Sequence, residues 1–453
     1  MKDQLLQGWM ICILVCFMPL HVLARFSPSP GYRMWNVDSV GGASTVNGTQ
    51  RVLVSVNHGS FVSFVRNQAI QPPHTLLFPS VLGESLECDV VPAFLAPGLL
   101  QEYPFLVSWT GLCTGESSVT LTYDLNIPGS LDATFFTNGQ VVRVHSDKQS
   151  SNGELYVIRR WRDREVHPDF KFITKEPPQA EEENFLPRFL SGDRHLKQIL
   201  DGLSVPPEVN KAYKFRIAFL VTQPFVTKLE ANSKADVISY LVNILARING
   251  IFLRELGVFF ELIEEIGQII CLGEDPPGCQ DWTDEETSAF RNLTAPASTS
   301  SQLVLQVGDL ITAAGVDSSA YEIGHALYDL EDQFGLAFLG VVCRDIKALG
   351  VSGVGGLNIS LTSDNFVVDL LAHELGHQLL GSHTFNYCPQ NPSFEEGFDF
   401  GPYSIPATAY EPGSGVTIMS YAVSIDVISF MSFLYMFHPK SSRSRQTLGY
   451  MRS

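Results

Sequence analysis

The sequence predicts a mixed α and β protein in which a β-rich domain precedes a second domain with helices packed on a twisted mixed sheet. Three observations support this fold class. Short β-branched runs separated by turn residues fill the first third of the chain. A strand, a long helix and a second strand then follow in order from Phe215. Further strands precede a histidine-rich segment, His373–His383, whose spacing fits a helix.

The chain begins with features of a secretory signal peptide over residues 1–24. Lys2 precedes an apolar stretch from Trp9 to Leu20, and Ala24 offers a small residue for cleavage. A membrane anchor is the alternative, but the stretch is short against the about 20 apolar residues that a spanning helix needs. We therefore expect a secreted, extracellular protein without stable membrane insertion.

Residues 25–173 are expected to form the β-rich domain. Its clearest strands are 52–56, 119–123 and 140–144, which are bounded by turn dipeptides such as Asn-Gly and Pro-Gly. Residues 174–210, which carry two Pro-Pro pairs and a Glu run, are expected to be a linker.

The second domain is expected over residues 211–423. A strand at 215–221 leads to a helix at 233–256 with apolar residues three and four apart, which Gly257 ends. A strand at 258–263, a less regular insertion at 271–301 and strands near 321–328, 335–342 and 355–361 follow. Ser363-Asp364-Asn365 then caps the helix that bears His373. We take His325, in one of these strands, to be structural.

The most informative motif is His373-Glu374-Leu375-Gly376-His377 followed by His383. On a helix, His373 and His377 lie one turn apart on the same face, so both imidazoles can bind one Zn²⁺ ion. His383 supplies a third ligand, and a fourth position stays open for water, as in catalytic zinc sites. Glu374 can take the proton of that water as general base.

A second motif lies downstream at 409–422, where Met419 sits in the string Thr-Ile-Met-Ser-Tyr. Together the two motifs resemble the metzincin zinc endopeptidases, and most closely their reprolysin (adamalysin)-like branch. Residues 321–325 and 335–343 are also similar to strands of that branch. The resemblance covers 211–422 well and the N-terminal third weakly.

The resemblance implies a zincin-like catalytic domain with one catalytic zinc ion and a protein or peptide substrate. It implies that Met419 shapes the floor of the site, and it offers Tyr421 as a transition-state donor, with a packed core tyrosine as the alternative. Strand 335–342 would be the edge that pairs with an extended substrate. Residues 25–173 would be a propeptide that assists folding and blocks the cleft, with Arg159–Arg162 as a processing site or a solvated strand edge.

The chain departs from the family pattern in two places. Where the family has Gly three residues after the second His, this chain has Leu380. Forcing Leu into a left-handed conformation costs about 1–2 kcal/mol, so we expect the helix to run one residue further and Gly381 to make the turn, which puts the reach of His383 in question. The apolar tail, 424–453, is either a closing helix or a truncated or misread end of the coding sequence.

Six of the eight cysteines lie beyond the signal peptide, an even number that predicts disulfides in an exported chain. We expect the pairs 88–113, 271–279 and 343–388. An alternative is that Cys88 or Cys113 caps the zinc in a latent form. Sequons occur at Asn47, Asn292 and Asn358. The net charge of −18 argues against nucleic acid as a partner, and no oligomeric state is predicted.

The leading hypothesis is a secreted zinc metalloendopeptidase. The rival is a metzincin-like secreted binding module that no longer cleaves, which Leu380 and the unusual tail would favour and the retained Glu374 disfavours. A zinc hydrolase that acts on other bonds is a third reading, which leaves the Met419 motif unexplained.

Overall fold

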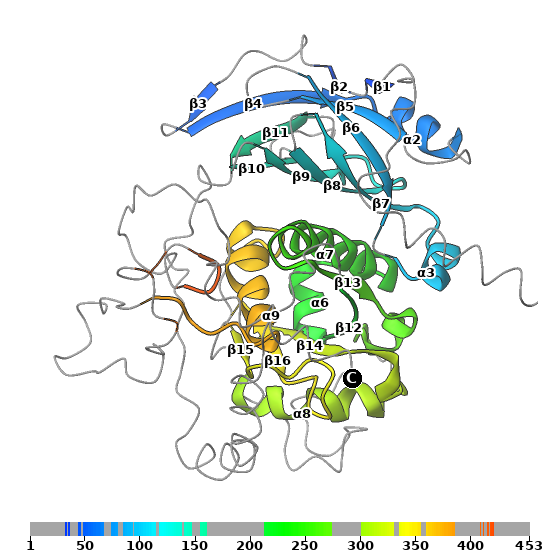
Figure 1. Ribbon diagram of the computed structural model, residues 1–453. Coiled ribbons are helices and arrows are strands. Elements are labelled where there is room, and N and C mark those ends of the chain that lie inside the picture. Colours follow the sequence, from blue (N-terminus) through cyan, green and yellow to red (C-terminus); the bar gives the residue numbers. More distant parts are fainter. Residues whose placement is uncertain are drawn as a thin grey trace, which may run out of the picture.

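The computed structural model describes two domains, shown in Figure 1. The described residues are 32–33, 35–36, 44–46, 49–67, 74–79, 85–93, 95–114, 117–137, 140–146, 155–160, 213–273, 300–329, 335–354, 359–385, 408, 411, 415 and 417–420. Outside them lie segments 1–24, 174–210 and 424–453, the three sequons, Cys279, Cys388 and Tyr421. The predictions made for these parts therefore stay predictions.

The N-terminal domain is a sheet of eleven strands in the order β1-β5-β6-β7-β8-β9-β10-β11-β4-β2, with β3 paired to β4. Neighbouring strands are antiparallel except β1 and β5. The elements are β1 (Tyr32–Arg33), β2 (Trp35–Asn36), β3 (Ser44–Val46), β4 (Thr49–Val56), α2 (His58–Asn67), β5 (His74–Pro79), β6 (Ser85–Pro92), α3 (Pro97–Glu102), β7 (Leu106–Cys113), β8 (Ser117–Asp124), β9 (Asp132–Thr137), β10 (Gln140–Ser146) and β11 (Leu155–Arg160).

The N-terminal sheet folds back on itself around its own core. In Figure 1 strands β4 and β5 lie over β8–β11. Buried aromatic side chains such as Phe61, Phe78, Tyr123 and Phe135 form the core of this domain. The predicted strands at 52–56, 119–123 and 140–144 are confirmed within β4, β8 and β10. The predicted disulfide Cys88–Cys113 is present and joins facing residues of β6 and β7.

The C-terminal domain contains a five-stranded mixed sheet in the order β13-β12-β14-β16-β15, parallel except for β15. This confirms the predicted mixed sheet. Its elements are β12 (Tyr213–Val221), α6 (Gln223–Leu229), α7 (Lys234–Leu256), β13 (Val258–Leu262), the 3-10 helix η2 (Glu264–Ile269), α8 (Ser300–Ala313), the 3-10 helix η3 (Ser318–Ala320), β14 (Ile323–Tyr328), β15 (Gly335–Ala337), β16 (Gly350–Gly353), the π-helix η4 (Asn365–Leu371) and α9 (Ala372–Gln378).

Helix α7 confirms the helix predicted at 233–256. The Ser233 side chain accepts a hydrogen bond from the backbone N–H of Asp236, and the Asp236 side chain accepts one from the backbone N–H of Ser233. Gly257, at φ 68°, ends the helix. By length and composition α7 could cross a membrane, but its most apolar window is 78% buried inside the protein. Burial between the two domains accounts for its apolar character.

Two predicted strands are corrected by the structure. The strand expected at 335–342 ends at Ala337 because the chain turns at residues 339–340, where Gly340 has φ 66°. The strand expected at 355–361 is instead β16, Gly350–Gly353. Its glycines are required by close packing: a Cβ on Gly350 would lie 2.5 Å from His325 Nδ1, and one on Gly353 2.6 Å from the Tyr328 carbonyl oxygen.

The other cysteine predictions have different outcomes. Cys271 is disulfide-bonded to a partner outside the described residues, so the pair 271–279 stays a prediction. Cys343 is a free thiol, and the predicted pair 343–388 is therefore not formed in this structure. Cys343 lies in a left-handed turn with φ 61°.

Candidate metal centre

The active-site helix comprises η4 and α9, and all of its residues are buried. Its first turn is capped by Ser363, whose Oγ accepts a hydrogen bond from the backbone N–H of Phe366 at 3.2 Å. The prediction that Ser363 takes part in the cap is confirmed. Asp364 makes no side-chain cap, because its carboxylate pairs with arginines instead. The helix begins with a π-helical segment, a feature often found at functional sites.

The helix ends through Leu380, which corrects the prediction that Gly381 makes the turn. Leu380 has φ 72°, and Gly381 is not among the positive-φ residues of the described chain. The backbone N–H of Leu380 donates to the carbonyl of His377 at 2.8 Å, and that of Gly381 to Gly376 at 2.7 Å. These two bonds form a Schellman motif with leucine where glycine is usual. The turn leaves enough chain for His383 to fold back.

Leu380 occupies this position because its side chain has a packing partner. A Cβ built on Gly340 would lie 2.8 Å from Leu380 Cδ1, so the leucine lies directly against a residue that has no side chain. The local sequence shows only the backbone cost of a left-handed leucine at residue 380, because the contacting residue lies forty positions upstream in the chain.

We expect Leu380→Gly to be more stable than Leu380→Ala by about 1 kcal/mol, because both variants lose the contact with Gly340 and only alanine retains the left-handed strain. Urea unfolding of the two variants measures the difference. At a right-handed position the order would be reversed, since glycine there costs about 0.5–1 kcal/mol relative to alanine. A more stable alanine variant would therefore contradict the left-handed turn.

Three histidine side chains converge beneath the active-site helix. His383 Nε2 lies 3.2 Å from His373 Nε2 and 3.1 Å from His377 Nε2. One ligand atom from each histidine lies within 4.8 Å of the others. The structure thus brings together the three residues that the motif predicted as metal ligands, including His383.

Backbone carbonyls fix the orientation of two of these rings. His373 Nδ1 lies 2.6 Å from the carbonyl oxygen of Ile418, and His377 Nδ1 lies 2.6 Å from that of Gly381. A carbonyl can only accept, so each Nδ1 is protonated and each Nε2 carries the lone pair of the ring, directed at the centre. Sequence reasoning missed these two partners because they are main-chain groups.

The arrangement fits a zinc ion. Three nitrogens bound to one tetrahedral zinc at about 2.0–2.1 Å lie about 3.3–3.4 Å apart, close to the two distances observed here. Burial and the neighbouring rings hold the pKa of His373 well below its usual value, and burial lowers the pKa of His377 to about 4. Neutral imidazoles are the form that binds a metal.

Glu374 lies buried between the helix and the edge strand β15. The residue is 4% exposed, and burial raises the pKa of the carboxyl to about 8. Among the described residues, no group hydrogen-bonds to its Oε2 atom. A Cβ on Gly335 would lie 2.4 Å from Oε1, so only glycine fits opposite this carboxyl. An edge strand and an unsatisfied buried carboxyl therefore meet beside the three histidines.

Met419 lies in a turn that supports the third histidine. It is fully buried, and its Cε is 3.4 Å from the position a Cβ would take on Gly381. Its carbonyl accepts hydrogen bonds from the backbone N–H of Thr384 at 3.0 Å and from Thr384 Oγ1 at 3.1 Å. The Met419 turn is thus tied to the residue that follows His383. Glu411, which the sequence interpretation did not single out, closes the same turn by accepting from Thr417 Oγ1 at 2.6 Å.

His325 holds the helix against the sheet and is structural, as predicted. Its Nδ1 lies 2.9 Å from Gln378 Oε1 and its Nε2 2.9 Å from Ser352 Oγ. Gln378 Nε2 also donates to the carbonyl of Gly324 at 2.8 Å. Gln378 follows His377 directly, so this buried network of hydrogen bonds fixes the position of the helix turn that carries a candidate ligand.

The burial of His325 predicts a pH dependence of stability. Burial lowers its pKa from 6.5 to about 4, so between these values the unfolded chain binds a proton that the folded chain does not. Its contribution to stability is therefore lost as the pH falls from 6.5 toward 4, by up to about 1.4 kcal/mol per pH unit. We expect His325→Asn to flatten the pH dependence of the unfolding free energy in this range. An unchanged slope would contradict the prediction.

Comparison with protein families agrees with the motif. Residues 214–432 match the family model described as Metallo-peptidase family M12B Reprolysin-like. No curated protein matches the chain. A solved structure described as that of a chaperone-substrate complex is 9% identical, with a TM-score of 0.25, and the match covers 55% of this chain and 28% of that one; so distant a likeness carries no argument. Residues 214–432 are a reprolysin-like metzincin domain of metallopeptidase family M12B.

Proposed function

We propose that the protein is a secreted zinc-dependent metalloendopeptidase. The observation that carries this proposal is the convergence of three histidine Nε2 atoms beside a buried carboxyl, at the edge of a sheet. His373, His377 and His383 would hold one zinc ion. A role in catalysis would explain why the Glu374 carboxyl is buried with no hydrogen-bond partner for Oε2 among the described residues. Membership in a metallopeptidase family supports the same reaction class.

Each residue has a separate role in this proposal. A zinc ion held by the three histidines would polarise the scissile carbonyl and lower the pKa of a bound water. Glu374 takes a proton from the attacking water and delivers it to the leaving amine. The backbone of β15, Gly335–Ala337, is the edge of the sheet and would pair with an extended substrate. Met419 and the carbonyls of Ile418 and Gly381 hold the ligand rings in place.

The proposal is tested by metal removal. We expect the protein purified after signal cleavage to contain about one zinc per chain and to cleave a general protein substrate such as casein, since a three-histidine site supports that stoichiometry. A chelator should abolish cleavage, and added zinc should restore it. Zinc without cleavage, in a sample whose linker 174–210 has been cut, would favour the secreted binding module. Cleavage that survives removal of zinc would contradict the proposal.

Export is a separate part of the proposal and rests on residues 1–24 and on the disulfides. We expect N-terminal sequencing of the secreted chain to show that the signal peptide has been removed. The glycan sites, the processing site at Arg159–Arg162 and the tail at 424–453 remain predictions from the sequence.

A further inference from the structure

Helix α7 lies at a close contact between the two domains. A Cβ on Gly250 would lie 2.9 Å from Phe136 Cε2 and 3.2 Å from Thr120 Cγ2, both in the N-terminal sheet. The Arg254 guanidinium lies 5.2 Å from the centre of the Phe136 ring. Asn243 Nδ2 donates to Thr122 Oγ1 at 3.0 Å. Figure 1 shows α7 directly below β7–β9. One face of this helix is thus covered by the N-terminal domain.

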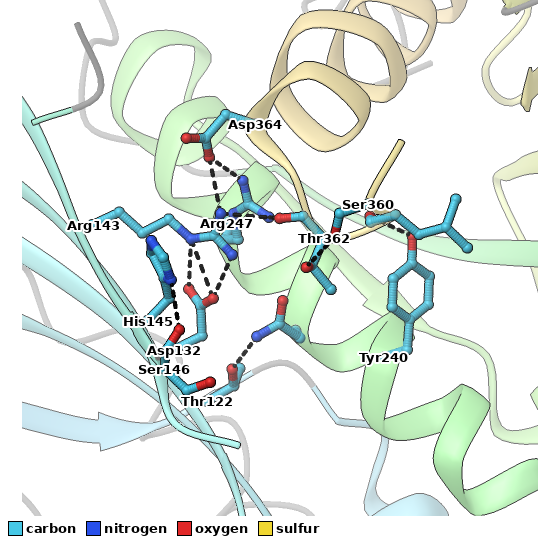
Figure 2. Close-up of polar contacts among 12 residues, drawn as sticks. Thr122, Asp132, Arg143, His145, Ser146, Tyr240, Arg247, Ser360, Thr362 and Asp364 are labelled. Carbon is cyan, nitrogen blue, oxygen red and sulfur yellow. Dashed lines mark hydrogen bonds and ion pairs between the residues drawn. The ribbon is translucent and has the colours of Figure 1, made fainter. Parts of the chain in front are cut away.

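Beside this contact lies an interdomain ion cluster of five residues, shown in part in Figure 2: Asp132, Arg143, Arg159, Arg247 and Asp364. The first three belong to the N-terminal domain. Arg143 lies 2.6 Å from Asp132 and 3.2 Å from Asp364, and Arg159 lies 3.1 Å from the other oxygen of Asp364. Arg247, from α7, pairs with the same carboxylate. The side chains are between 3% and 15% exposed.

The backbone carbonyl of Thr362 contacts one arginine from each domain. It accepts a hydrogen bond from Arg143 at 2.9 Å and another from Arg247 at 2.8 Å. The segment 362–364, which leads into the active-site helix, is therefore held from both domains at once. The arginines hold the pKa of Asp132 below its usual value despite burial.

The position of this cluster separates it from the candidate metal centre. Asp364 precedes the helix, and His373 follows nine residues later, on the order of 13 Å along a helix axis. The contacts of the N-terminal domain described above reach α7 and segment 362–364. Buried ion pairs add little net stability by themselves. The buried apolar side chains Leu99, Leu106 and Phe136 of the N-terminal domain, which belong to the same hydrophobic cluster as α7, therefore supply the attraction, and the ion pairs fix the orientation of the two domains.

We propose that the N-terminal domain, residues 32–160, is a permanent partner of the C-terminal domain and stays bound after the linker is cut. It covers the face of α7 that carries Asn243, Gly250 and Arg254, and it holds segment 362–364 through Arg143 and Arg159. This differs from the propeptide role that the sequence predicted, in which the domain blocks the cleft. It goes beyond the proposed function and does not depend on cleavage activity.

The test uses the full chain with a protease recognition sequence inserted between residues 174 and 210. After cutting, gel filtration at about 1 μM and physiological salt shows whether the two fragments elute together, as permanent association requires. We expect co-elution, confirmed by both fragments in one peak on a denaturing gel. Separate elution of the two fragments would overturn the proposal.

Two pairs of variants locate the interface. Gly250→Leu places a side chain where the two domains meet, whereas Gly267→Leu makes the same change where a Cβ meets no atom within 4 Å.

The second pair of variants removes ion pairs. Arg159→Met removes the ion pair to Asp364, whereas Arg216→Met removes a partly exposed ion pair to Glu322. We expect the dissociation constant to rise at least ten-fold in the first member of each pair and to stay unchanged in the second. Circular dichroism of each cut sample checks folding, and equal association in all four variants would overturn the proposal.

Discussion

Glu374→Gln is expected to lower the rate of peptide cleavage by about 10²–10⁴-fold while the zinc content stays unchanged. Glutamine keeps the size of the side chain but cannot accept the proton of the attacking water. Burial raises the pKa of this carboxyl to about 8, and a nearby cation would favour its charged, basic form. Cleavage rates at saturating substrate and metal analysis of the same sample measure both quantities.

The control for this variant is Glu261→Gln, since Glu261 lies on β13, the opposite edge of the sheet from β15, and pairs with Lys214 of β12. We expect the control to cleave at the wild-type rate. If Glu374→Gln cleaves as fast as the control with its zinc in place, Glu374 is not the general base. If the variant loses its zinc, the carboxylate helps to hold the metal, and the assignment of roles would have to change.

The parts of the structure that depend on local pattern were predicted well. Helix α7 follows from apolar residues three and four apart with a capping serine before it and a glycine after it. The convergence of His373 and His377 follows from helix geometry alone. Helix α8 was missed even though Leu303, Val307 and Leu310 carry the same spacing, because its first turn falls where an irregular insertion was expected.

The parts that depend on contacts between distant segments could not be predicted from local pattern. Strand β16 has few strand-forming residues, and its glycines are explained only by the side chains of His325 and Tyr328 that lie against it. Leu380 adopts a left-handed conformation that the sequence argued against, beside Gly340. Asp364 was predicted as a helix cap, whereas its arginine partners come from strands more than two hundred residues earlier and from α7.

Asp364→Asn is expected to lower the free energy of unfolding by about 3–5 kcal/mol, the usual cost of removing one partner from a buried ion pair. The variant leaves three guanidiniums beside a neutral side chain. Burial and the neighbouring Arg143 already lower the pKa of Arg247 to about 10, which shows how unfavourable a second cation is at this position. Urea unfolding of the full chain, followed by circular dichroism, measures the loss.

The matched control is Glu322→Gln, which also removes the charge of a carboxylate paired with arginine. The pair of Glu322 with Arg216 is partly exposed, with 43% of the arginine side chain in solvent, so the expected loss is at most about 1 kcal/mol. Arg247 is the other C-terminal member of the interdomain ion cluster, and it pairs with Asp364. Asp364→Asn removes this partner, so adding Arg247→Met should recover part of the lost stability by removing the charge of Arg247. The double variant could also lose more stability than Asp364→Asn and Arg247→Met lose together. That result would show that Arg247 is stabilised by its hydrogen bond to the Thr362 carbonyl rather than by Asp364. Recovery would show that the stability lost in Asp364→Asn comes from the unpaired charge of Arg247 beside the start of the active-site helix.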